Sequence, residues 1–502
     1  MPATHFNVVV IGAGLSGIGA GYRLQTRCPG MSYVIFEGRA ALGGTWDLFR
    51  YPGVRSDSDM YTLGYPFRPW RGAKAIADGP SILSYLRETA QEFGIDRHIR
   101  FKHRVVAAQW SSRESRWQIE VEAESGVGRY TCDFLYGCTG YYRYDFGYQP
   151  TFPGIENYRG TFVHPQHWPE NLDYAGKRVV VIGSGATAVT LVPAMSHTAG
   201  HVTMLQRSPS YILSLPAHDP FVSLFRRVLP DHVAHRLLRW KNILITLGIF
   251  GLSRSAPELT KWVIRYGAKQ HLPPGYELDK HFKPRYRPWD QRLCVVPDAD
   301  LFQAIGAGRV SVVTGQIDRF TESGIRLTSE EELAADIVVS ATGLQMLALG
   351  AIRLSVDATL IDPANCFIYK GVMLSNVPNF AFCFGYTNAS WTLHADLAST
   401  YVCRLLNYMQ RHRFRTCVPA CNTAALDRKP LLDLTSGYVQ RAAESLPKQS
   451  SKKPWFIRQN YLRDTLTMKL QRMEDGVLQF AGRQRTAEVR VRQPEAETVK
   501  PR

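Results

Sequence analysis

Residues 6–37 read FNVVVIGAGLSGIGAGYRLQTRCPGMSYVIFE, and this stretch indicates the fold class. The β-branched run at 6–11 is typical of a buried parallel strand. A G-x-G-x-x-G pattern follows it and leads into a helix-like segment rich in small residues. A second strand-like run, 33–36, ends on an acid. This order predicts a βαβ unit of the dinucleotide-binding type.

The spacing within this stretch explains the chemistry. Gly12 permits the tight turn, Gly14 lets backbone N–H groups approach a pyrophosphate, and Gly17 lets the helix pack on the strand. The helix N-terminus adds unpaired donors and a positive dipole end. Glu37 lies 20 residues after Gly17, where an acid accepts a hydrogen bond from a ribose hydroxyl. The first site is therefore predicted to bind a dinucleotide with a free ribose, as in FAD.

The same pattern returns in the middle of the chain. Residues 178–182 are strand-like, GSGATA follows at 183–188, and the next strand, 202–205, ends at a basic residue instead of an acid. Arginine can pair with a 2′-phosphate that an acid would repel, so this site is predicted to prefer NADPH over NADH. We assign to it Gly183, Ser184, Gly185, Ala186, Thr187, Ala188, Val189, Arg207 and Ser208.

Two Rossmann units predict an α/β chain in which an NADPH domain is inserted into an FAD domain. The strand-like run 336–340 and its Ala-Thr-Gly continuation would return the chain to the first domain. We expect the first part of the FAD domain at 1–150, the NADPH domain at 151–345 with a helical insertion at about 215–285, and the second part of the FAD domain at 346–482. The basic tail, 483–502, is expected to be disordered.

Composition narrows the function classes. The 502 residues include 45% hydrophobic and 21% charged residues, which excludes disordered and collagen-like classes. Nine cysteines without a C-x-x-C pair argue against a disulfide scaffold, a zinc ribbon or a thioredoxin-type motif. There is no signal-peptide pattern, and no apolar run reaches the roughly 18 residues that a membrane span needs. We expect a reduced, cytoplasmic protein.

The formal net charge is +17, yet no helix-turn-helix, zinc-finger or RNA-recognition signature is present, so no nucleic-acid partner is expected. Anionic dinucleotides or an anionic membrane surface account better for the charge. Residues 224–272 place apolar runs between tryptophans and cations. This pattern suits an interfacial helix at the inner face of the cell membrane, or else a lid buried over the active site or in a subunit interface. No pattern predicts an oligomeric state.

Residues 43–57, GGTWDLFRYPGVRSD, fit [AG]-G-x-W-x4-[FY]-P-G-x3-D, and residues 158–169, YRGTFVHPQHWP, are similar to F-x-G-x3-H-x3-W-[PD] with Tyr158 in place of Phe. In these motifs the chain resembles the Baeyer–Villiger flavin monooxygenases. The subgroup most similar in sequence is that of the ethionamide-activating monooxygenases, in residues 44–53, 164–169, 288–294 and 385–392.

The resemblance implies that NADPH reduces FAD and that O2 then forms a C4a-peroxyflavin. This oxidant would convert a small hydrophobic ketone to an ester or lactone, and could oxygenate sulfur in thioamides or sulfides. Such chemistry needs a cation beside the flavin and a carboxylate that holds it. By resemblance these are Arg292 and Asp57. Many relatives carry Lys before that arginine; Gln291 stands here, so the NADPH preference depends more on Arg207 and Ser208.

The resemblance also places further residues. His164 and Trp168 belong to a linker between domains, and residues 386–391 either line the substrate pocket or pack in the core. Arg55, Ser56 and Asp57 would lie between flavin and nicotinamide. FAD contacts are implied for Gly12, Gly14, Ser16, Gly17, Glu37, Gly44, Thr45, Trp46, Asp47, Leu48 and Val105.

Three other functions use similar domains. A disulfide reductase would need a redox cysteine pair at C-x-x-C or C-x4-C spacing, and the sequence has neither. An N- or S-oxidising flavin monooxygenase would lack the 43–57 pattern and would not need Arg292. A flavin-binding sensor without activity would have no reason to keep Arg292, Asp57 and both glycine loops.

Overall fold

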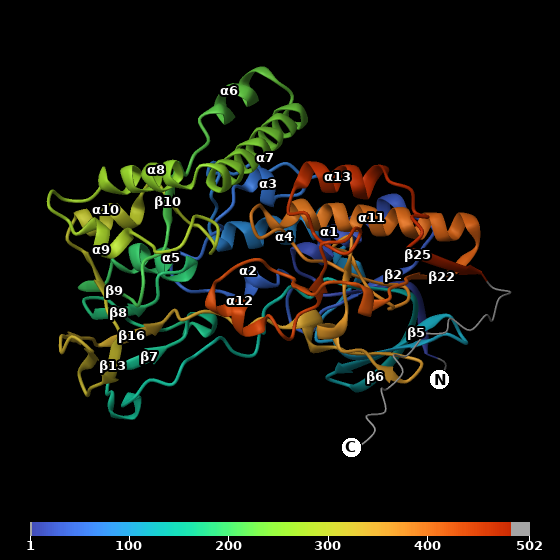
Figure 1. Cartoon of the computed structure of the whole chain (residues 1–502), viewed down its shortest axis with the longest axis horizontal. Coiled ribbons are helices and arrows are strands. Elements are labelled where there is room, and N and C mark those ends of the chain that lie inside the picture. Colours follow the sequence, from blue (N-terminus) through green and yellow to red (C-terminus); the bar gives the residue numbers. More distant parts are fainter. Residues whose placement is uncertain (1–2, 483–502) are drawn as a thin grey trace, which may run out of the picture.

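The computed structural model of the chain describes residues 3–482, and the predicted tail lies outside these residues. A nine-stranded sheet organises one half of the molecule (Figure 1). Its centre is β1 (Thr4–Ile11), which pairs in parallel with β2 (Tyr33–Phe36) and β6 (Gly126–Gly137). Val8, Val9 and Val10 are fully buried, as expected for a strand covered on both faces. The remaining strands are β3 (Ile99–Arg100), β4 (Arg104–Ser111), β5 (Arg116–Ala123), β17 (Arg353–Val356), β18 (Thr359–Leu360) and β21 (Phe380–Phe382).

A parallel five-stranded sheet organises the other half, with the order β12-β9-β8-β16-β7. It comes from one continuous segment, whereas the first sheet takes strands from before and after that segment. This arrangement confirms the predicted α/β class with one Rossmann-like unit inserted into another; the boundaries at 150 and 345 stay predictions. The strands are β7 (Thr161–Val163), β8 (Arg178–Ile182), β9 (His201–Gln206), β12 (Val310–Thr314) and β16 (Ile337–Ser340).

Helices cover both sheets. α1 (Leu15–Arg27) and α11 (Trp391–His412) pack against each other over the first sheet. A Cβ at Gly17 would lie 1.8 Å from the Gly12 carbonyl oxygen, which is why the third glycine of the loop allows α1 to pack so closely on β1. The other helices of these layers are α2 (Thr45–Leu48), α3 (Met60–Leu63), α4 (Gly79–Glu92), α5 (Ala186–Met195), α10 (Asp300–Gly306), α12 (Gly437–Ala442) and α13 (Tyr461–Leu470).

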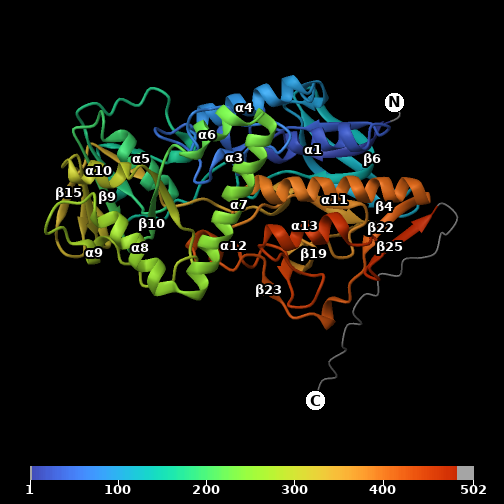
Figure 2. The ribbon, with the colours of Figure 1, turned by 90° about the horizontal axis from the view of Figure 1, so that it is seen from above.

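The predicted helical insertion consists of α6 (Phe221–Val228), α7 (Asp231–Ser255), α8 (Pro257–Lys269) and α9 (Leu278–Phe282). Seen from above, α7 lies along the boundary between the half with the five-stranded sheet and the half with the nine-stranded sheet (Figure 2). Arg239 fixes α7 there: its Nη1 donates to the carbonyl oxygens of Tyr61 and Gly64, both at 2.8 Å. Among the described residues, no helix is both long enough and apolar enough to cross a membrane.

Smaller strands complete the chain. β10 and β11 form a parallel pair beside the helical insertion, and β13, β14 and β15 form an antiparallel sheet in the half that contains the five-stranded sheet. All nine cysteines are free thiols, as expected from their spacing. These strands are β10 (Ile212–Leu215), β11 (Cys294–Pro297), β13 (Ile317–Phe320), β14 (Gly324–Leu327), β15 (Glu332–Ala334), β19 (Ile368–Tyr369), β20 (Met373–Leu374), β22 (Phe414–Pro419), β23 (Lys429–Pro430), β24 (Lys448–Gln449) and β25 (Leu478–Gly482).

Candidate functional site: two joined cavities at the domain interface

A cavity of about 490 Å³ lies where the carboxyl ends of β1, β2 and β6 face the inserted unit. This is the edge at which parallel sheets bind ligands. Both halves of the molecule contribute to its wall, including the first glycine loop, the 43–57 segment and the start of α5. Of the predicted FAD and flavin–nicotinamide contacts, Gly12, Gly14, Ser16, Glu37, Gly44, Thr45, Trp46, Arg55, Ser56, Asp57 and Val105 line it.

The floor of the cavity is a cradle without side chains. Gly12 has φ +100°, which glycine adopts without strain, and Gly14 caps α1 without a side-chain hydrogen bond. The N–H groups of the first turn of α1 are therefore available to an anion. A Cβ at Gly14 would approach only the backbone of Gly44, with its Cα at 3.6 Å and its N at 3.9 Å, so the space above the loop is open. The cradle fits the pyrophosphate of FAD.

Glu37 lies at the rim of this cradle. Its carboxylate accepts from the N–H groups of Ala13 at 2.7 Å and Arg39 at 2.9 Å. Burial raises the pKa of Glu37, although these two hydrogen bonds oppose the rise. Each oxygen keeps a lone pair for a ribose hydroxyl, as the sequence predicts.

The second glycine loop is built in the same way but opens to solvent. Gly183 has φ +138°, and a Cβ there would lie 2.4 Å from the Ala341 carbonyl oxygen. Gly185 caps α5 with no atom near the position of a Cβ. Ser184 donates through Oγ to the Ser208 carbonyl oxygen at 3.1 Å, so the loop is joined to the segment that carries Arg207. Arg207 and Ser208 are exposed and directly follow β9, where a 2′-phosphate would lie.

Several residues predicted as contacts are buried and do not line the cavity. Ala188 and Val189 are fully buried in the core beneath the second loop, and Leu48 packs in the same core. Asp47 is buried, does not line the cavity, and pairs at 2.6 Å with Arg39, whose backbone N–H donates to Glu37. Of the second-loop residues, Ala186 and Thr187 reach the cavity wall.

Arg292 and Asp57 form the ion pair that the resemblance implies, although 235 residues separate them. Arg292 Nε lies 2.9 Å from Asp57 Oδ2, and Nη2 donates to Oδ1 at 3.2 Å. Such a two-point contact fixes the plane of the guanidinium. The carboxylate holds the pKa of Arg292 well above its ordinary range, so the side chain is a permanent cation. Both side chains remain about 30% exposed, 31% and 28%, and thus accessible from the cavity.

Arg55, which was expected to contact the cofactors, also pairs with a carboxylate of the protein. Its Nη1 lies 2.5 Å from Asp300 Oδ2, which ties the 43–57 segment to the start of α10 in the inserted unit. Because Arg55 also lines the first cavity, it joins the two halves at the position where flavin and nicotinamide are expected to meet.

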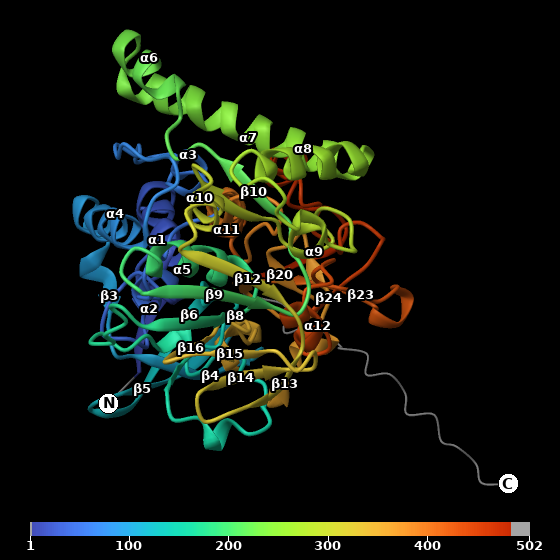
Figure 3. The ribbon, with the colours of Figure 1, turned by 90° about the vertical axis from the view of Figure 1, so that its left-hand side faces the viewer.

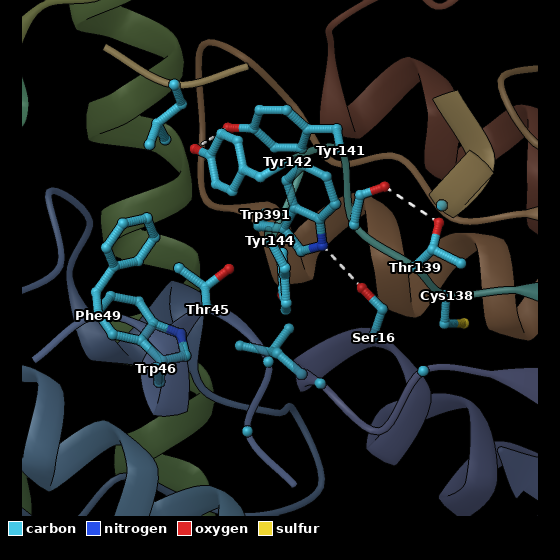
Figure 4. A pocket seen from close by; sticks show the side chains of 18 of the residues that line it. Ser16, Thr45, Trp46, Phe49, Cys138, Thr139, Tyr141, Tyr142, Tyr144 and Trp391 are labelled. Carbon is cyan, nitrogen blue, oxygen red and sulfur yellow. Dashed lines mark hydrogen bonds between the residues drawn. The ribbon is translucent and has the colours of Figure 1, made fainter. Parts of the chain in front are cut away.

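An aromatic wall of the first cavity contains two residues that were not predicted, Tyr141 and Tyr142. Tyr141 stacks on Trp391 with ring centroids 5.0 Å apart, and its hydroxyl lies 2.6 Å from that of Tyr142 (Figure 4). Trp391 Nε1 donates to Ser16 Oγ at 2.8 Å and so joins α11 to α1 in the wall of the first cavity. The run YYRY at 141–144, directly after the strand-end pattern 136–140, was the signal that could have located part of this wall.

A second cavity of about 330 Å³ adjoins the first. The two share Asp57, Ser58, Arg292 and Val295 in their linings, so the ion pair lies at their junction. The second cavity is largely apolar and lies between α7, the β10–β11 pair and residues 387–390. The segment 386–391 therefore lines both cavities: Tyr386 and Trp391 line the first, and the four residues between them line the second.

Comparison with known proteins agrees with this geometry. A family model described as flavin-binding monooxygenase-like matches residues 74–242, and one described as an NAD(P)-binding Rossmann-like domain matches residues 10–78. The chain is 51% identical over 480 residues to the FAD-containing monooxygenase EthA of Mycobacterium tuberculosis, covering 95% of this chain and 98% of EthA. It is 52% identical over 477 residues to EthA of Mycolicibacterium smegmatis, covering 95% and 97%.

A solved structure titled oxidized steroid monooxygenase bound to NADP shares the fold, with a TM-score of 0.72. The match covers 84% of this chain and 89% of that one at 23% identity, and it carries information on the fold alone.

Proposed function

This chain belongs to the family of FAD-containing monooxygenases, and from that premise we propose that it is an NADPH-dependent Baeyer–Villiger enzyme. Its substrate would be a small hydrophobic ketone, which it converts to an ester or lactone with one oxygen atom from O2. Sulfur in thioamides or sulfides would be a second acceptor. The observation that carries the proposal is the position of Arg292, a permanent cation at the junction of a dinucleotide cavity and an apolar cavity.

The balanced reaction consumes ketone, O2, NADPH and a proton, and gives ester, water and NADP⁺. When bound, FAD accepts hydride from NADPH and supplies the activated oxygen. The chain contributes charge and position. The Arg292 guanidinium stabilises negative charge that develops on oxygen next to the substrate carbonyl, and it can do so at neutral pH because it does not lose its proton. Asp57 holds the guanidinium in one orientation.

We assign FAD to the unit formed by 1–150 and 346–482, and NADPH to the inserted unit, 151–345. The cradle at Gly14 and the rim carboxylate of Glu37 support the first assignment. The open loop at Gly185 and the exposed Arg207 support the second. Arg55 and Asp57 would orient the two ring systems relative to each other because they lie on the segment between the two loops.

Arg207→Ala is expected to weaken NADPH binding and to leave NADH binding nearly unchanged. The guanidinium would pair with the 2′-phosphate, which NADH lacks. We expect KM for NADPH to rise about tenfold or more, with kcat and the NADH parameters within about twofold. Initial rates with each coenzyme measure this. Equal losses with both coenzymes would contradict the assignment of Arg207 to the 2′-phosphate.

The proposal is tested with the FAD-loaded protein and a panel of cyclic and linear ketones and thioethers. NADPH oxidation should accelerate with at least one panel member, and mass spectrometry should find an ester, lactone or sulfoxide in proportion to the NADPH consumed. Conversion of all consumed O2 to H2O2 with every ketone and every thioether would contradict it.

A further inference from the structure

The exposed apolar side chains of this protein are concentrated on four helices. Eighteen large hydrophobic side chains are exposed in the described residues, and fifteen of them lie on α6, α7, α8 and α13. The remaining three, Val127, Phe146 and Leu360, are scattered elsewhere. Single exposed apolar residues are ordinary, but a contiguous group of this size marks an interaction surface.

The four helices lie along one side of the molecule. They run together at the top of Figure 1, and Figure 3 shows α6, α7 and α8 forming a rim that stands clear of the body. A ring contact between Trp240 of α7 and Tyr461 of α13, with centroids 6.0 Å apart, joins the fourth helix to the group. We call the exposed side of these helices the helical face.

The exposed residues follow helical periodicity, so each helix turns one stripe outward. On α8 they are Leu259, Trp262, Val263 and Tyr266, at intervals of three and four residues. Trp262 is 60% exposed and stacks on Tyr266, with centroids 5.4 Å apart. Inward-facing Ile264 of the same helix is buried. α8 is therefore amphipathic, with one stripe in the core and a second stripe that has no partner within the described chain.

The charge of the helical face points to its partner. Residues 221–270 contain nine Lys and Arg against two Asp and Glu; one of the nine cations is buried, and four are paired with carboxylates. Arg227, Arg236 and Lys269 are exposed among the apolar stripes. Cations next to exposed tryptophan and leucine are typical of helices that lie in the interface of an anionic bilayer. A second copy of the chain would bring the same positive excess against itself, which disfavours a symmetric dimer through this face.

We propose that the helical face docks on the surface of an anionic lipid bilayer. The aromatic and aliphatic side chains would enter the boundary between headgroups and acyl chains, and the cations would contact lipid phosphates. No helix crosses the bilayer in this arrangement.

The helical face also covers the second cavity. Phe221 of α6 and Ile245 of α7 line that cavity, and both side chains are 48% exposed. Docking would therefore place the apolar cavity beside the acyl chains. If the proposed function holds, an apolar substrate dissolved in the bilayer reaches Arg292 through this cavity without passing through bulk water.

Co-sedimentation of the FAD-loaded holoenzyme with vesicles tests the docking. Wild-type protein should pellet with phosphatidylcholine vesicles that contain about one third phosphatidylglycerol, and less with pure phosphatidylcholine or at high salt. The triple variant Leu259→Ser, Trp262→Ser, Val263→Ser should bind at least about tenfold more weakly. The control variant Val127→Ser, Leu360→Ser removes two apolar side chains outside the face that are even more exposed, and it should bind like wild type.

The proposal is overturned if wild-type protein stays in the supernatant at low salt, or if the triple variant and the control bind equally. If the wild-type protein does not bind vesicles but forms a dimer, and the triple variant is monomeric, the face binds a second copy of the chain instead. Oxidation of a water-soluble ketone in the absence of vesicles should be equal in all three proteins, so a failure of docking is distinguishable from a failure of the proposed reaction. Bound FAD absorbance verifies that each variant is folded.

Discussion

Arg292→Ala is expected to lose ester formation by about 10²- to 10³-fold while NADPH still reduces the bound FAD. Removing the cation removes the charge that stabilises anionic oxygen at the junction of the cavities. It does not touch the glycine loops that would bind the two dinucleotides. Reduced flavin would still react with O2, so NADPH consumption should continue with H2O2 as the product. The measurement is product yield per NADPH, with H2O2 determined in parallel.

Two companion variants sharpen this test. Arg292→Lys keeps the positive charge but loses the two-point contact with Asp57, and should fall between wild type and Arg292→Ala. Arg254→Ala removes an exposed arginine that pairs with Asp290 at 3.1 Å, and should keep full activity. Unchanged product yield in Arg292→Ala would show that this arginine is a structural ion pair and not the catalytic cation.

Gly14→Ala is expected to abolish FAD binding without unfolding the protein. Gly14 has φ −79° and ψ −170°, which alanine adopts without strain, and the added Cβ meets only ordinary van der Waals contact at 3.6 Å. The methyl group would occupy the space through which a pyrophosphate approaches the backbone N–H groups. We expect FAD affinity to fall about 100-fold or more, measured by flavin fluorescence during titration of the apoprotein.

The matched control is Gly30→Ala, because a Cβ at Gly30 meets no atom within 4 Å. It should bind FAD like wild type. If the Gly14→Ala protein binds FAD with wild-type affinity, the assignment of the pyrophosphate to this loop is wrong. Circular dichroism of both apoproteins establishes that the loss is one of binding and not of folding.

The fold was predictable where the information is local. A βαβ unit is encoded in about thirty consecutive residues, and the positions of Gly12, Gly17 and Glu37 in the structure follow from their spacing. The second unit was predictable for the same reason.

Contacts between distant segments were not predictable from spacing. The approach of Asp57 to Arg292 was anticipated only through family resemblance, and the bond between Trp391 and Ser16 across 375 residues was not anticipated at all. Such contacts depend on how the two units dock, and docking is determined by surfaces that no local pattern describes. Arg55 illustrates this point: its motif indicated a cofactor contact, and the structure adds a partner, Asp300, from the other unit.

The second cavity also could not be predicted from local sequence patterns. It is enclosed by residues 57–59 and 75–76, by α7, by β10 and β11, and by the loop before α11, and these segments are far apart in the sequence. The sequence showed an unusual apolar and basic stretch at 224–272. That stretch supplies both a wall of the cavity and the exposed helical face, so neither a lid nor an interfacial helix describes it completely.

Incorporation of labelled oxygen tests the central claim most directly. The FAD-loaded protein is incubated with NADPH, a ketone that accelerates NADPH oxidation, and ¹⁸O2, and the product is analysed by mass spectrometry. Our account predicts an ester or lactone that carries one ¹⁸O atom, with loss of this product in Arg292→Ala. A product without ¹⁸O, or H2O2 in amounts equal to the NADPH consumed with no oxygenated product, would contradict it.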